Sequence, residues 1–151
     1  MKPSFRPCTS ADSEWAYELK REAYQPVVER QFGPWDEAFQ RRLFAERWKP
    51  EFSRLILVDD QPVGLLAVRE RAEEHWIDEI QLAAPWRGRG LGTLLIKAEI
   101  EHARTLGKAV SLQVLRENTR ARNLYQRLGL RVSAETATHH RMTSAPVTAL
   151  P

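Results

Sequence analysis

The chain has 151 residues, of which 42% are hydrophobic and 28% charged, and this suits one globular domain with one core. No stretch approaches the 18 apolar residues of a membrane helix, and the first residues lack the apolar region of a secretory signal. The single cysteine, Cys8, excludes an internal disulfide framework and a cysteine-based zinc cluster. We therefore expect a cytoplasmic protein with no membrane partner.

The charge is distributed unevenly along the chain. The formal net charge is +3, yet residues 1–86 carry −4 and residues 87–131 carry +7. The basic part favours an anionic ligand. The aromatic residues of a single-strand nucleic-acid binder are missing there, because that part holds Tyr125 and little else. We expect no nucleic-acid partner, with a nucleic-acid binder that uses the basic part of the chain as a rival interpretation.

The predicted elements alternate between helix and strand. Residues 4–9 form a first strand, and helices follow at 13–24 and 37–48, with a loop at 25–34 because of Pro26, Gly33 and Pro34. The later elements are strands 55–58, 63–68 and 75–83, helix 91–106, strand 110–115, helix 119–128 and a hairpin over 130–142. The order β-α-α-β-β-β-α-β-α-β-β predicts an α/β domain with a single mixed central sheet and helices on both faces. We expect the domain to span residues 1–143 and the tail 144–151 to be disordered.

Three alternate glycines lie between a strand and a helix, in the sequence Arg87-Gly88-Arg89-Gly90-Leu91-Gly92. Glycines let the backbone turn tightly and leave its N–H groups uncovered, and the helix start adds unpaired N–H groups with a partial positive charge. This arrangement favours binding of a phosphate or pyrophosphate, although a turn that only reverses the chain has the same composition. The sequence does not match the dinucleotide-binding motif Gly-x-Gly-x-x-Gly, because Thr93 occupies the position of its last glycine. The P-loop sequence is absent.

These residues resemble the GNAT superfamily of acetyl-coenzyme A dependent N-acetyltransferases. The family signature is Arg or Gln, two residues, Gly, one residue, Gly or Ala, and Arg87, Gly90 and Gly92 match it. A second block matches at Asn118, Ala121, Leu124-Tyr125 and Gly129-Leu130, with Leu130 in place of the usual Phe. The resemblance extends over about residues 54–142 and implies the GNAT fold.

The resemblance implies acetyl-coenzyme A as co-substrate. The backbone near Leu82 would pair with the pantetheine amides, Asn118 would bond the pantetheine arm, and Arg122 or its neighbour Arg120 would meet the nucleotide phosphates. The coenzyme-binding residues implied in this way are Leu82, Arg87, Gly88, Arg89, Gly90, Leu91, Gly92, Asn118 and Arg122.

The resemblance also implies an acyltransferase that moves the acetyl group to a primary amine by direct attack in a ternary complex. Tyr125 would be the general acid for the leaving thiolate, unless it is only a core aromatic. Glu79 is the candidate base, with Asp78 as a rival on the opposite face of the strand. The alternative is a non-catalytic acyl-coenzyme A sensor or interaction module.

The acceptor is open between a small-molecule amine and a peptide amine. Tyr24 and Trp35, with nearby carboxylates, are candidates to hold a cationic amine, although the same residues suit a small core with a charged rim. We expect no metal, because the histidines His75, His102, His139 and His140 lack metal-ligand spacing, and His102 lies on an apolar stripe where packing is expected. A homodimer through an apolar sheet edge is compatible with such a fold.

Overall fold

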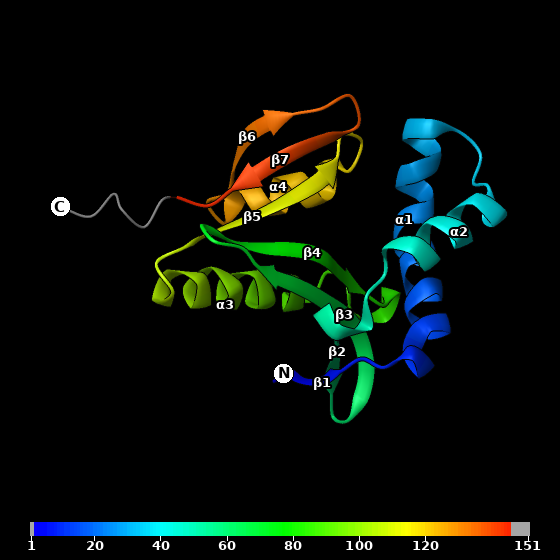
Figure 1. The fold of residues 1–151 in the computed structure, drawn as a ribbon, viewed down its shortest axis with the longest axis horizontal. Coiled ribbons are helices and arrows are strands. Elements are labelled where there is room, and N and C mark those ends of the chain that lie inside the picture. Colours follow the sequence, from blue (N-terminus) through cyan, green and yellow to red (C-terminus); the bar gives the residue numbers. More distant parts are fainter. Residues whose placement is uncertain (1, 146–151) are drawn as a thin grey trace. The chain divides into compact units, whose positions relative to one another are not determined.

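The computed structural model of the protein describes residues 2–145. The strands are β1 (Ser4–Pro7), β2 (Ser53–Val58), β3 (Gln61–Glu70), β4 (Glu74–Leu82), β5 (Ala109–Leu115), β6 (Arg131–Glu135) and β7 (His139–Thr143). They form one seven-stranded mixed sheet in the order β1-β2-β3-β4-β5-β7-β6 (Figure 1). The predicted mixed α/β fold is therefore confirmed.

The chain divides into two compact units, and each is described by itself. Unit 1 is Met1–Ala67 with Glu79–Arg87, and unit 2 is Val68–Asp78 with Gly88–Pro151. Strands β3 and β4 each contribute one part to unit 1 and the other part to unit 2.

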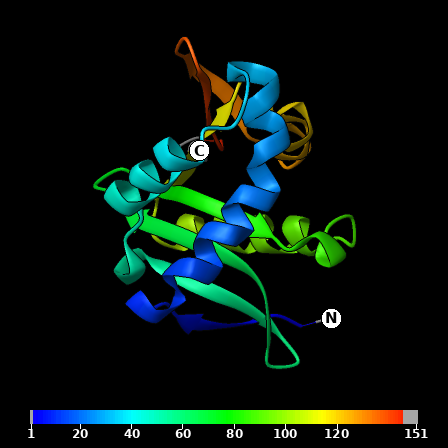
Figure 2. The same ribbon diagram turned by 90° about the vertical axis from the view of Figure 1, so that its right-hand side faces the viewer.

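Unit 1 contains the first two helices. Helix α1 (Ser13–Phe32) is one continuous helix in Figure 2 and includes Pro26. The predicted loop at 25–34 is therefore wrong up to Phe32. Proline removes one intrahelical hydrogen bond, but the buried Val27 directly after it gains by staying on the helix. The helix ends only at Gly33, whose φ of 97° breaks the helical conformation.

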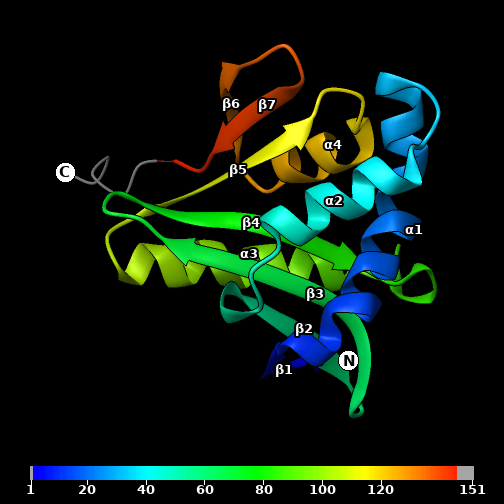
Figure 3. The same ribbon diagram turned by 45° about the vertical axis from the view of Figure 1, so that its right-hand side comes forward.

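Helix α2 (Glu37–Arg47) begins where the Oδ1 of Asp36 accepts a hydrogen bond from the N–H of Phe39 at 3.0 Å. The chain then passes through the short helix η2 (Pro50–Phe52) into β2 (Figure 3). The core of this unit is built from Cys8, Ala16, Leu19, Leu55, Leu65 and Ala67, with Trp15, Phe44, Trp48, Leu57 and Ala83 packed against it.

Gly64 on β3 permits an unusually close approach of β4. A Cβ at this position would lie 2.4 Å from the carbonyl oxygen of Gln81 and 2.8 Å from Cδ2 of Leu82. The N–H of Ala83 donates to the carbonyl of Val63 at 2.8 Å. The end of β4 is thus held tightly against β3, and this fixes where the following turn begins.

Unit 2 contains a parallel pair of strands, in which Glu74–Ile77 of β4 are in register with Ala109–Leu112 of β5. Strand β5 also pairs antiparallel with β7, and β7 pairs with β6 as the predicted hairpin. Helix α3 (Leu91–Thr105) precedes β5 and helix α4 (Thr119–Arg127) follows it. The elements predicted for this part of the chain are confirmed.

The predicted tail begins at residue 144, but Ser144 is ordered. Its N–H donates to the carbonyl of Val110, and its Oγ accepts from the N–H of Val110, both at 2.8 Å. The expected disorder of the tail from residue 146 onward lies outside the described residues. Within residues 2–145, no helix combines the length and apolar character needed to cross a bilayer.

Candidate functional site

The glycine turn leads into α3 as the sequence predicted. Gly88 and Gly90 have φ values of 70° and 83°, in the left-handed region that glycine adopts without strain. Gly90 is the N-cap of α3 and supplies no capping side chain. The backbone N–H groups of the first turn therefore point outward with a partial positive charge, as an anion-binding site requires.

Helix α1 also starts without a side-chain cap, but the other two α-helices of the described residues have one. Helix α2 is capped by Asp36, and helix α4 is capped by Asn118. Gly88, Arg89 and Gly90 are exposed, whereas Leu91 is fully buried and anchors the helix start. A buried anchor beneath an exposed turn holds the N–H groups in place for a ligand.

Two arginines of α4 have different surroundings. A Cβ at Gly88 would lie 3.8 Å from Nη2 of Arg120, so this guanidinium lies beside the glycine turn. Nη1 of Arg122 instead lies 2.9 Å from Nε2 of His140 on β7. The structure thus brings Arg120 to the turn. The sequence favoured Arg122. Sequence alone does not show which of two nearby arginines on one helix has its side chain directed toward the glycine turn.

Asn118 uses its side chain as a helix cap. Its Oδ1 accepts from the N–H of Ala121 at 3.3 Å, which leaves the side-chain NH2 group available for a ligand. Tyr125, on the same helix, is 8% exposed and contributes to the core of this unit. Burial of the Tyr125 ring is compatible both with a purely structural aromatic residue and with the predicted general acid.

Arg87 is engaged inside unit 1. Its Nε donates to the carbonyl of Leu82 at 2.8 Å, and its Nη2 lies 3.3 Å from Oε1 of Glu22. The same oxygen of Glu22 accepts from the N–H of Ala84 at 3.1 Å. The carbonyl of Leu82 therefore already accepts one hydrogen bond, and a pantetheine amide would have to use its second lone pair.

The two candidate bases are both paired with a cation. Glu79 lies in unit 1, where Oε1 accepts from Nζ of Lys20 at 3.0 Å and Oε2 contacts Nε2 of Gln81. Asp78 lies in unit 2, where it accepts from Nε of Arg69 and, at 2.9 Å, from Nε1 of Trp76. The sequence predicted the carboxylates but not their partners, because Lys20 lies 59 residues from Glu79.

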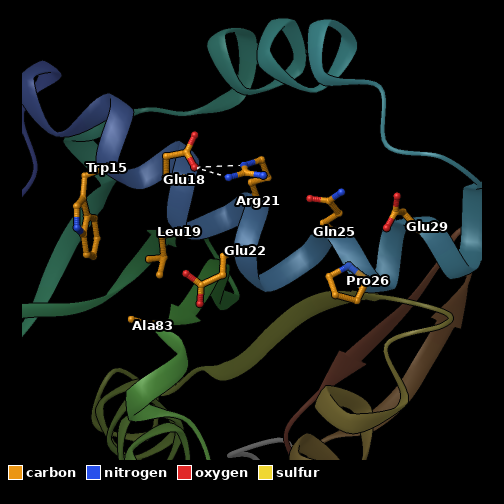
Figure 4. Close-up of a pocket in the computed structure, with 9 residues that line it drawn as sticks. All are labelled: Trp15, Glu18, Leu19, Arg21, Glu22, Gln25, Pro26, Glu29 and Ala83. Carbon is orange, nitrogen blue, oxygen red and sulfur yellow. Dashed lines mark hydrogen bonds and ion pairs between the residues drawn. The ribbon is translucent and has the colours of Figure 1, made fainter.

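A cleft of about 510 Å³ follows one side of α1 near the end of β4 (Figure 4). Its acidic lining residues are Glu18, Glu22 and Glu29. A basic lining residue, Arg21, forms an ion pair with Glu18 at 2.8 Å. The other lining residues are Trp15, Leu19, Gln25, Pro26 and Ala83. A partly apolar, acidic cleft suits a cationic ligand with an apolar portion.

The aromatic residues predicted to hold the acceptor have structural partners. The indole Nε1 of Trp35 donates to Oε2 of Glu37 at 2.9 Å. The backbone N–H of Trp35 donates to Oε2 of Glu29 at 3.3 Å. Tyr24 lies on α1, half-buried, and neither aromatic residue is among the described residues that line the cleft. The hydrogen bonds of Trp35 to Glu29 and Glu37 are compatible with both interpretations of these residues.

A strand that ends in a glycine turn at an uncapped helix is an arrangement that can bind an anion in α/β domains. Residues 15–130 match the Acetyltransferase (GNAT) family. The chain belongs to this family, and the resemblance of its two sequence blocks is confirmed.

A curated relative, an uncharacterized N-acetyltransferase of Methanocaldococcus jannaschii, is 40% identical over 80 residues. The match covers 48% of this chain and only 35% of that protein, so the chain spans about a third of the relative's length.

Two solved structures show the same fold. One is the PaiA N-acetyltransferase from Thermoplasma acidophilum in complex with coenzyme A, with a TM-score of 0.74, 19% identity and coverage of 95% and 99% of the two chains. The other is Arabidopsis thaliana Naa50 with the bisubstrate analogue CoA-Ac-MVNAL, with a TM-score of 0.64, 18% identity and coverage of 96% and 99%.

Proposed function

We propose that the protein is an N-acetyltransferase that moves the acetyl group of acetyl-coenzyme A to a primary amine by direct attack in a ternary complex. The observation that carries this proposal is the uncapped start of α3, with Gly88 and Gly90 in left-handed conformations. Coenzyme A in the solved relative from Thermoplasma acidophilum supports it.

The residues of the turn fit the coenzyme's pyrophosphate. The outward N–H groups of the first helical turn and the guanidinium of Arg120 supply positive charge from two elements of unit 2. Arg89 adds charge at the exposed rim. Asn118 keeps an NH2 group for the pantetheine arm while its oxygen caps α4.

Acetyl-coenzyme A, when bound, supplies an activated thioester, so the protein needs no nucleophile of its own. Tyr125 then donates the proton that the departing thiolate requires. A buried tyrosine holds its proton away from bulk water, and its hydroxyl is the polar end of an otherwise apolar ring.

The acceptor amine must lose a proton before it attacks. A lysine-like amine has a pKa near 10.4, so neutralising it at pH 7 costs about 4–5 kcal/mol. Glu79 is the proposed base. The ammonium group of the acceptor carries the same charge as Lys20, so it can compete with Lys20 for the carboxylate of Glu79. We assign the acidic cleft along α1 to the acceptor, and Trp35 is linked to it through its hydrogen bond to the lining residue Glu29.

The test is turnover of acetyl-coenzyme A with a panel of amines, and the release of free coenzyme A thiol is the measured signal. The panel contains small diamines and short peptides with a free N-terminus, because the acceptor is a small-molecule or peptide amine. Tyr125→Phe should retain acetyl-coenzyme A binding and lose at least tenfold in kcat. Acetyl-coenzyme A binding without turnover of any amine would favour the non-catalytic sensor instead.

A second comparison tests the assignment of the two arginines. Arg120→Ala should weaken acetyl-coenzyme A binding severalfold, whereas Arg122→Ala should leave it nearly unchanged, because Arg122 is directed to His140. Equal losses from both substitutions would contradict the assignment of Arg120 to the phosphates.

A further inference from the structure

Four chemistry-bearing side chains meet in unit 2, away from the glycine turn. They are Glu70 at the end of β3, His75 near the start of β4, and Glu99 and His102 on α3. One donor atom each of Glu70, His75 and His102 lies within 4.8 Å of the other two. Residues from three elements thus converge on one point of this unit.

The ring of His75 is fixed from one side. His75 is 2% exposed, and its Nε2 lies 2.8 Å from Oε2 of the buried Glu99. The other ring nitrogen, Nδ1, contacts Oε1 of Glu70, so without a metal both ring nitrogens carry a hydrogen that they donate to a carboxylate. A buried carboxylate behind one ring nitrogen is the arrangement that orients metal-binding histidines.

His102 completes the set from the last turn of α3. Its ring centroid lies 5.4 Å from that of His75 at an interplanar angle of 73°. The sequence predicted that His102 packs in the core, but the side chain is exposed. The expectation of no metal rested on spacing along the chain, and that spacing does not show residues joined by folding.

We propose that Glu70, His75 and His102 form a binding site for Zn²⁺. Two imidazole nitrogens and one carboxylate oxygen are a donor set that zinc prefers, with a fourth position left to water. Zinc lies about 2.0–2.2 Å from such donors, so Glu70, now in direct contact with Nδ1 of His75, must move aside to admit the metal. Glu70 and His102 are exposed and can move, while the buried His75 stays in place.

The surroundings balance the charge of the site. Nζ of Lys108 lies 2.8 Å from Oε2 of Glu70, so this carboxylate keeps only Oε1 for the metal. Zinc takes the place of the Nδ1 proton of His75, which passes to solvent. The two remaining carboxylate charges of Glu70 and Glu99 offset the charges of the metal and Lys108 in part.

The proposed site is separate from the coenzyme site and does not depend on the proposed function. His102 stands eleven residues beyond Leu91, which is about 16 Å along a helix axis. A metal there would tie the end of β3 and the start of β4 to the last turn of α3. Loss of the metal should therefore leave coenzyme binding intact.

The experiment is calorimetric titration of Zn²⁺ into the untagged, chelator-treated full chain, with Mg²⁺ in parallel. Zn²⁺ should bind at a stoichiometry of one, and Mg²⁺ should not, because imidazole donors suit zinc. At 100 times the dissociation constant, Zn²⁺ should raise Tm by about 5–10 °C. Absence of zinc binding by the wild-type chain would overturn the proposal.

Two variants and one control locate the site. His102→Ala and Glu70→Gln should each weaken Zn²⁺ binding at least tenfold and, because both side chains are exposed, should fold normally without metal. His139→Gln, a change to another histidine of unit 2, should bind zinc as the wild type does. Unchanged zinc affinity in His102→Ala would place the metal elsewhere and refute the assignment.

Discussion

Gly64→Ala tests how tightly the end of β4 is held. The new Cβ would lie 2.4 Å from the carbonyl oxygen of Gln81. Real Cβ atoms essentially never lie within 3.0 Å of a heavy atom of a residue that is not a chain neighbour. The strands must part by about 0.6 Å to relieve this contact, and a second contact, with Leu82 at 2.8 Å, resists the movement. Backbone shifts of this kind cost about 2 kcal/mol, which lowers Tm by about 4–8 °C.

The assay is thermal unfolding followed by far-UV circular dichroism, with Gly107→Ala as the matched control. Gly107 has a φ of 70°, and a Cβ added there would meet no atom within 4 Å, so alanine at this position suffers only backbone strain of about 1 kcal/mol. Gly64→Ala should also weaken acetyl-coenzyme A binding, because Leu82 and Ala83 lead into the turn. A Gly64→Ala protein as stable as the wild type would show that β3 and β4 can part at this point without cost.

Three further predictions concern titratable groups of unit 1. Burial raises the pKa of the Cys8 thiol to about 11, so alkylation at pH 8, followed by mass spectrometry, should be about 200-fold slower than for an exposed cysteine. Burial also raises the pKa of Tyr17 to about 12, and Tyr17→Phe, which loses the 2.7 Å hydrogen bond to Glu37, should cost about 0.5–1.5 kcal/mol in urea unfolding. The hydrogen bond from Arg6 holds the pKa of Asp12 below its ordinary value, so its contribution is present above the unfolded pKa of about 3.9 and is lost as pH falls. Asp12→Asn should therefore cost less than about 1 kcal/mol at pH 7, and this cost should shrink as the pH falls below the unfolded pKa.

The order of the elements and the glycine turn could be predicted from the sequence, because both depend on local patterns. Hydrophobic period, turn residues and glycine spacing act within a few positions of the chain. The continuation of α1 past Pro26 could not be predicted in this way. Burial of Val27 outweighs the local cost of proline, and burial is decided by the tertiary fold.

The partners of the candidate site residues were also beyond sequence reasoning. Lys20 meets Glu79 and Glu22 meets Arg87 only because α1 packs near the end of β4. The choice between Arg120 and Arg122 depends on side-chain direction on one helix. Glu70, His75 and His102 come together in the same way, from segments that carry no shared motif.

The proposed acetyl transfer requires that the protein bind acetyl-coenzyme A, and calorimetric titration measures this, with ATP and duplex DNA as controls. We expect micromolar binding of acetyl-coenzyme A at a stoichiometry of one, severalfold weaker binding to Arg120→Ala, and no comparable binding of DNA. Absence of acetyl-coenzyme A binding by the folded wild-type protein would mean that the turn at Arg87–Gly92 is only structural, and would contradict the proposed acetyl transfer.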